Sequence, residues 1–149
     1  RKNGTDGTDM EQRVWLTVRG EQEYEGLERE RTELRVPGTM ERTGDGFLLR
    51  YEEPGEDGAA VHTRLSVTPE SVTLTRTGAV CTQLRFAHGL VYTSMYAMPF
   101  GAVPLETETR ALRWRLGAHG GLIELRYRLL LGGQAGECLL RIRVQLRGA

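Results

Sequence analysis

The residues whose side chains could catalyse a reaction or hold a metal are few, and they stand far apart in the chain. His88 precedes a glycine and His119 precedes a glycine pair, which are ordinary turn positions, while His62 takes the outward position of a strand pattern. No histidine has a Cys, Asp or Glu at the short spacing typical of a metal site. We therefore expect the protein to hold neither a metal ion nor another cofactor.

The chain also offers no recognisable nucleophile or pair of acid and base. Cys81 and Ser94 have no basic residue beside them, and Glu52 and Glu53 are adjacent carboxylates. Adjacent strand residues face opposite ways, so these two carboxylates cannot act on one substrate. The sequence predicts no catalytic residues, and we expect a protein that is not an enzyme.

Polar residues at positions that a strand would turn inward are more informative. Arg76 alternates with Val72 and Leu74, and Glu53 takes the same side of its strand as Tyr51. Two threonines and a second tyrosine stand at similar positions later in the chain. The candidate site consists of these inward polar residues: Arg76, Glu53, Tyr51, Tyr96, Thr107 and Thr109.

An inward arginine requires a partner, because burying an unpaired guanidinium or carboxylate is costly. In one interpretation, Arg76 forms a structural ion pair with Glu53 that fills the interior or fixes the strand register. In the other, Arg76 faces a cavity and holds the acidic head of a small ligand against apolar walls. The pattern favours the structural pair, since buried charges usually pair within the protein.

The elements that must position these residues are β-strands. From Val14 to Leu146 apolar residues recur at every second position, broken by turn signals, which indicates half-buried antiparallel strands and no helix. We expect about eight to ten strands, near residues 13–24, 27–43, 47–53, 61–67, 72–76, 80–86, 90–98, 102–116, 123–131 and 138–146. Such a meander has two exposed edges unless it closes. The predicted fold class is all-β, a single closed antiparallel meander barrel, with an open sandwich as the lesser alternative.

Two interruptions of the alternation predict local irregularities. Between residues 102 and 116 the apolar positions change from odd to even, which indicates a bulge near Arg110–Ala111. Pro37–Gly38 interrupts the second strand and predicts a bend or a bulge there.

Length and composition bound the remaining possibilities. The chain of 149 residues suffices for one domain, which we place at residues 10–149. Residues 1–9 are polar and rich in turn formers, which predicts a disordered leader or a cloning remnant, with Met10 as the native start. No apolar stretch of the sequence reaches membrane-spanning length, and we expect neither a signal peptide nor a disulfide framework from the two cysteines. We expect a cytoplasmic protein that does not contact a membrane.

Several short segments, taken in order, resemble one family. They are Gly44-Asp45-Gly46-Phe47 followed by Tyr51-Glu52-Glu53, then the segment from Val72 to Gly78, Leu84-Arg85-Phe86, the segment from Tyr96 to Gly101, and Thr107-Glu108-Thr109. Their order and spacing, from about Val14 to Val144, resemble the YwiB-like β-barrels, a family of uncharacterised bacterial proteins placed with the lipocalin-like (calycin) folds. The resemblance implies a closed barrel of roughly eight strands, and it implies no activity.

Charge divides the chain into two halves. Residues 1–75 carry 16 acidic and 10 basic residues, whereas residues 76–149 carry 4 acidic and 10 basic ones, so a neutral chain has oppositely charged halves. The outward arginines of the last three strands could form one basic face: Arg113, Arg115, Arg126, Arg128, Arg141, Arg143 and Arg147. Barrel closure would bring the acidic run Glu21–Glu33 beside them, so we expect self-neutralisation rather than binding of nucleic acid.

Two functions from different classes remain open. The first is a non-catalytic barrel that binds a small amphipathic or anionic ligand, with Arg76 as its anchor. The alternative is a structural or interaction protein that uses its outer surface, either as a homodimer or on an acidic or nucleic-acid partner.

Overall fold

The computed structural model describes residues 11–55 and 58–148, and every regular element in these ranges is a β-strand. The expected leader at residues 1–9, and Met10, lie outside the described residues. In chain order the strands are β2 (Gln12–Tyr24), β3 (Glu30–Thr43), β4 (Gly46–Pro54), β5 (Ala60–Val67), β6 (Val72–Gly78), β7 (Thr82–Phe86), β8 (Val91–Met98), β9 (Gly101–Gly117), β10 (Gly120–Leu131) and β11 (Gln134–Leu146).

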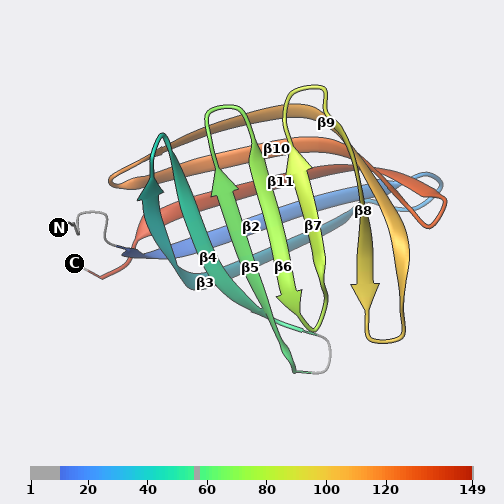
Figure 1. Cartoon of the computed structure of the whole chain (residues 1–149), viewed down its shortest axis with the longest axis horizontal. Helices are drawn as coiled ribbons and strands as arrows, with labels where there is room; N and C mark the ends of the chain where they lie inside the picture. The colour runs from blue at the N-terminus through green and yellow to red at the C-terminus, as the bar shows by residue number, and fades with distance from the viewer. Residues whose placement is uncertain (1–10, 56–57, 149) are drawn as a thin grey trace.

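These strands form one antiparallel sheet that curls into a nearly closed barrel (Figure 1). The spatial order is β7-β6-β5-β4-β3-β2-β11-β10-β9-β8, so each strand pairs with its neighbour in sequence except at two places. At the first, β2 pairs with β11 from Val14–Leu146 to Tyr24–Gly136, which joins the two ends of the meander. The prediction of an all-β meander closed by its first and last strands is confirmed.

The second exception is the seam between β7 and β8, which are the two edges of the sheet. In the described part of the chain, their backbones pair at one bridge, where Cys81 and Ala97 exchange hydrogen bonds of 3.0 and 2.9 Å. A side-chain bond of 3.1 Å from Gln83 to the Tyr92 hydroxyl also crosses the seam. The two edges therefore lie next to each other, joined by a few bonds rather than by a full ladder.

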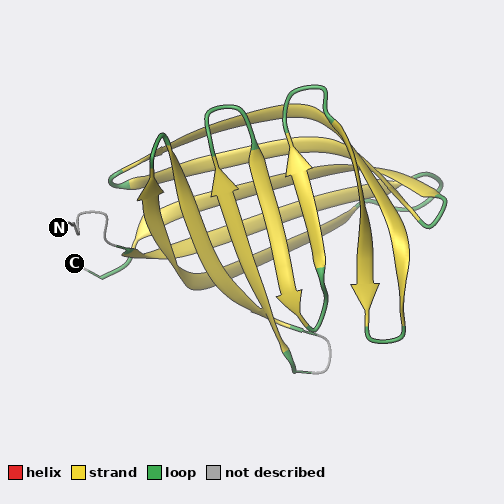
Figure 2. Ribbon diagram, in the orientation of Figure 1, coloured by secondary structure: helices red, strands yellow, loops and turns green. Residues whose placement is uncertain are grey.

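Alternation explains why these residues form strands and where the core lies. Along β5, for example, the buried residues Val61, Thr63, Leu65 and Val67 alternate with exposed ones. The inward apolar side chains of β2 to β7 and β9 to β11 meet in one core inside the barrel. The loops connect the strands at the ends of the barrel (Figure 2). Among the largest fully buried side chains are Phe86, Leu16, Met40, Leu49, Leu65, Ile123, Leu125 and Ile142.

The predicted irregularity on β9 is confirmed, and the one on β3 takes a different form. The register between β9 and β10 shifts between Arg126 and Tyr127, which pair with Ala111 and Thr109, so Arg110 is the extra residue of a bulge. On β3, pairing with β2 runs unbroken through Pro37 and Gly38, so no bulge occurs there. A Cβ atom on Gly38 would lie 2.4 Å from the carbonyl oxygen of Arg50, which explains the glycine as a point of close approach.

The two ends of the barrel differ in chemistry. At one end the indole of Trp114 donates a 2.8 Å hydrogen bond to the carbonyl oxygen of Thr68 and meets the ring of Phe47 edge-on at 6.0 Å. The apolar end is thereby covered by an aromatic side chain. Arg76 and Glu53 lie toward the other ends of their strands, so that end of the interior carries the polar groups.

Candidate functional site

Arg76 occupies the inner side of β6, between Thr63 on β5 and Thr82 on β7. Its side chain is 31% exposed, while its Nε atom is buried. The nearest carboxylate oxygen, Oε2 of Glu53, lies 3.7 Å from that nitrogen, which is too far for a hydrogen bond. Arg76 and Glu53 are thus brought together as predicted, but as a loose ion pair.

Glu53 has a better partner than Arg76. The hydroxyl of Thr63 donates a 2.9 Å hydrogen bond to the same Oε2 atom, and the Glu53 side chain is 23% exposed. Tyr51 is buried beside this group, and its pKa is raised to about 12, mainly by burial and secondly by the charge of Glu53, while Arg76 opposes the rise. Tyr51, Glu53, Thr63 and Arg76 therefore form one contiguous polar group on β4, β5 and β6.

Four buried polar atoms in the described chain have no hydrogen-bond partner: Arg76 Nε and the Oγ1 atoms of Thr82, Thr107 and Thr109. Thr82 lies on β7 at the β7–β8 seam, whereas Arg76 lies on β6 and the other two lie on β9, one strand away from the seam on either side. Leaving a buried polar group unpaired costs about 1–3 kcal/mol. Such a group of buried atoms is suited to a molecule that supplies the missing partners.

Sequence reasoning missed part of this polar layer. Tyr127 on β10 pairs with Thr109 and with Cys138, and its ring packs against Phe86 of β7 at 4.8 Å. Burial raises the pKa of the Tyr127 hydroxyl, and the charge of Arg76 opposes the rise. The members of the layer that were missed all take inward positions in the strand alternation, so the alternation could have identified them: Thr63, Thr82, Tyr127 and Cys138.

Tyr96 is a predicted site residue that, like Thr107 and Thr109, forms no hydrogen bond or ion pair with Arg76 or Glu53 in the described chain. It lies half-buried on the edge strand β8, opposite Val103. The alternation predicted which side of its strand Tyr96 occupies, but not that β8 lies across the seam from β7.

The buried acids of this layer predict a loss of stability in alkali. Burial raises the pKa of Cys138 from 9.0 to about 11, so above pH 9.0 the unfolded chain releases a proton that the folded chain keeps. The free energy of unfolding should therefore fall as pH rises above 9.0, and Tyr51 adds to the fall above 10.0. Urea titrations over this pH range measure the slope.

The matched control for this prediction is the second cysteine. Cys81 is exposed, whereas Cys138 is buried. Cys138→Ala should make the alkaline decline shallower, and Cys81→Ala should leave it unchanged. Equal slopes in all three proteins would contradict a role for the buried thiol.

Neither a metal centre nor a spanning helix is found in the part of the chain that the structure describes. No three His, Cys, Asp or Glu side chains there lie together in a way that could hold a metal ion. No helix there has the length and apolar content that crossing a membrane requires.

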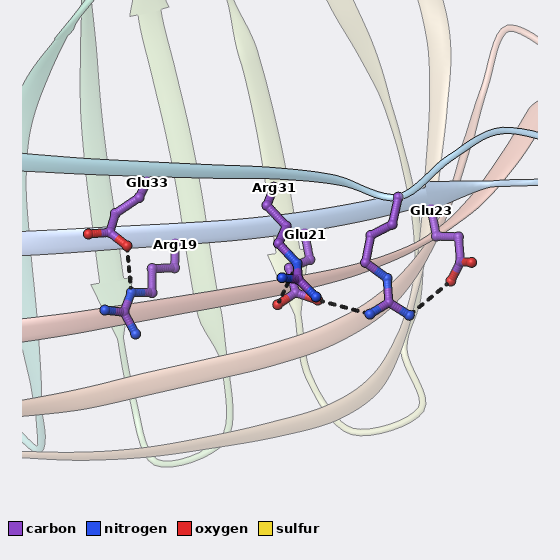
Figure 3. A network of polar contacts seen from close by, with 6 residues as sticks. Arg19, Glu21, Glu23, Arg31 and Glu33 are labelled. Atoms are coloured by element: carbon purple, nitrogen blue, oxygen red, sulfur yellow. Dashed lines mark hydrogen bonds and ion pairs between the residues drawn. The ribbon is translucent and has the colours of Figure 1, made fainter.

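The charges of the outer face pair differently from the sequence prediction. On β2, β3 and their turn, Arg19 binds Glu33 at 3.0 Å, and further arginines contact Glu21 and Glu23 (Figure 3). On the closing strands, Glu124 accepts hydrogen bonds from Arg113 and, at 2.7 Å, from Arg141. Across the described residues no ion pair joins an arginine of β9–β11 to a glutamate of β2 or β3, so the expected neutralisation across the β2–β11 pairing is wrong.

Comparison with known proteins gives one family and one fold. The family described as "Domain of unknown function (DUF1934)" matches residues 16–142. The chain is 32% identical over 88 residues to the "Uncharacterized beta-barrel protein YwiB" of Bacillus subtilis (strain 168), a match that spans 59% of this chain and 61% of that protein. The crystal structure of the ywiB protein from Bacillus subtilis aligns with a TM-score of 0.85 at 26% identity, covering 93% of this chain and 94% of that one. The resemblance expected from the ordered segments is confirmed.

Proposed function

Since the chain belongs to the DUF1934 family and shares the fold of the YwiB barrel, we propose that its interior binds a small amphipathic molecule with an acidic head group. The single observation that carries this proposal is the set of four buried polar atoms without partners, on Arg76, Thr82, Thr107 and Thr109. Each of these groups can donate a hydrogen bond, and an anionic head group accepts several such bonds at once.

Arg76 is the anchor in this proposal. Its neighbour Glu53 is already held by Thr63 at 2.9 Å, while the Nε atom of Arg76 stays 3.7 Å from that carboxylate. An incoming carboxylate would give this nitrogen the hydrogen bond that it lacks. The apolar part of the ligand would lie against the inward side chains that adjoin these groups, Leu84, Phe86, Leu105 and Leu129.

The test combines a search for a retained ligand with a defined probe. Native mass spectrometry of protein purified from its own host reports any small molecule that stays bound. Decanoate, a carboxylate with an alkyl tail, is then titrated by calorimetry into the wild type and Arg76→Met. Because a hydrogen bond to a charged group contributes about 1.5–3 kcal/mol, the variant should bind about 10-fold to 100-fold more weakly.

Arg64→Met is the matched control, since Arg64 lies on the adjacent strand β5 but is exposed on the outer side. It should bind decanoate as the wild type does. An equal loss in both variants, or a wild type that neither retains a ligand nor binds decanoate, would overturn the proposal.

A further inference from the structure

A row of arginines crosses the outer face of the long strands. The register aligns Arg115 of β9, Arg143 of β11 and Arg35 of β3, with Leu122 and Thr17 between them on β10 and β2. Neighbouring strands lie about 4.8 Å apart, so successive arginines of this row stand roughly 10 Å apart. The row contains three cations and no acid.

The adjacent row shows what a neutralised row looks like. There the register aligns Arg113, Glu124, Arg141, Arg19 and Glu33, and the two glutamates bind the three arginines. By contrast, among the described residues no ion pair involves Arg35, Arg115 or Arg143. No acidic side chain of the described chain therefore neutralises the arginine row.

Trp15 lies beside this row on the outer side of β2. The guanidinium of Arg35 lies 4.3 Å from the centre of its ring, and that of Arg147 lies 5.5 Å from the same ring. Cation–π contacts of this kind stabilise the positions of two otherwise flexible side chains beside the ring.

From this juxtaposition we propose that the face formed by Arg35, Arg115, Arg143, Arg147 and Trp15 binds a single-stranded polynucleotide. The charges fit phosphates, and guanidinium planes and aromatic rings are surfaces on which bases stack. The strands that carry the face curve round the barrel, and a flexible single strand can follow such a surface (Figure 1). An acidic peptide would satisfy the charges but would leave the stacked planes unused.

Fluorescence anisotropy of short labelled oligouridine and oligothymidine, over a series of salt concentrations, tests this proposal. Both strands should bind the wild type, and affinity should fall as salt rises. The triple variant Arg35→Gln, Arg115→Gln, Arg143→Gln should reduce the slope of log affinity against log salt by about 2, because each phosphate contact on a single strand contributes about 0.7. Stronger binding of one strand would identify it as the RNA or DNA form of the same partner.

The control triple is Arg42→Gln, Arg64→Gln, Arg85→Gln, three exposed arginines on β3, β5 and β7, away from this row. It removes the same charge and should keep the wild-type slope. Trp15→Leu should weaken binding of both oligonucleotides at least 5-fold, while its binding of inorganic polyphosphate should not change. Circular dichroism of this variant checks that it folds.

Three results would overturn the proposal. The first is no binding at low salt, and the second is an equal loss of slope in both triple variants. The third is polyphosphate binding as tight as that of the oligonucleotides together with no effect of Trp15→Leu, which would leave only a general attraction between charges. The decanoate experiment measures the interior, so the two proposals fail independently.

Discussion

Replacing Thr82, Thr107 and Thr109 together by valine should raise the free energy of unfolding by about 3 kcal/mol. The three hydroxyls are buried and have no hydrogen-bond partner in the described chain, and each costs at least about 1 kcal/mol when left unpaired. Valine keeps the branched shape and removes the hydroxyl. Denaturation in urea measures the gain in stability. Decanoate titration of the same variant should show weaker binding, because valine lacks the hydroxyls that are proposed to hold the ligand.

Thr63→Val is the matched control for this triple. Thr63 is as buried as the other three, at 2% exposure, but its hydroxyl donates to Glu53 at 2.9 Å. Its loss should destabilise the protein by about 1.5–3 kcal/mol, because the bond goes to a charged group. If the triple variant also destabilised the fold, the three hydroxyls would have partners after all, and the ligand proposal would lose its main support.

Phe86→Ala should lower the free energy of unfolding by about 3–5 kcal/mol, the largest loss that we expect from a single substitution. Phe86 is fully buried on the edge strand β7, and its ring packs on Tyr127 of β10 at 4.8 Å. This contact reaches across the barrel at the seam, where the backbone ladder is incomplete. The alanine variant leaves a cavity there, and thermal or urea unfolding measures its cost.

Phe86→Leu separates the lost volume from the lost ring contact, because leucine keeps most of the buried apolar volume. It should cost clearly less than alanine. Hydrogen exchange adds a local readout: in the alanine variant the amides of β7 should exchange faster relative to those of β2. A loss below about 1 kcal/mol for Phe86→Ala would show that the seam does not depend on this ring.

Alternation in the sequence was sufficient to predict the fold. Each strand buries one side, so the period of two identifies the strands, and the change of parity near Arg110 locates the bulge where the register shifts. Closure follows from the same pattern, because an open meander would expose the backbone of its first and last strands. The position of the seam could not be predicted from the alternation, because Thr82, Leu84 and Phe86 alternate with exposed residues as in a strand that is paired on both sides.

The candidate site was only partly predictable for a related reason. The odd or even position of a residue predicts which side of the strand it occupies, and it correctly predicted that Arg76 and Glu53 lie on the inner side. It gives no distances across the barrel, so it could not show that Thr63 binds Glu53 at 2.9 Å while Arg76 stays at 3.7 Å. Partners on the outer face depend equally on register, and for this reason the binding of Arg113 and Arg141 by Glu124 was missed.

The pairing of β2 with β11 reverses the usual relation between chain order and sheet position. The outermost strands in sequence lie at the centre of the sheet, and its margins, β7 and β8, come from the middle of the chain. Trimming either terminal strand would therefore divide the sheet into two pieces. A circular permutant opened in the 87–90 turn would instead place its new termini at the natural margins and leave the ladders from β7 round to β8 unbroken.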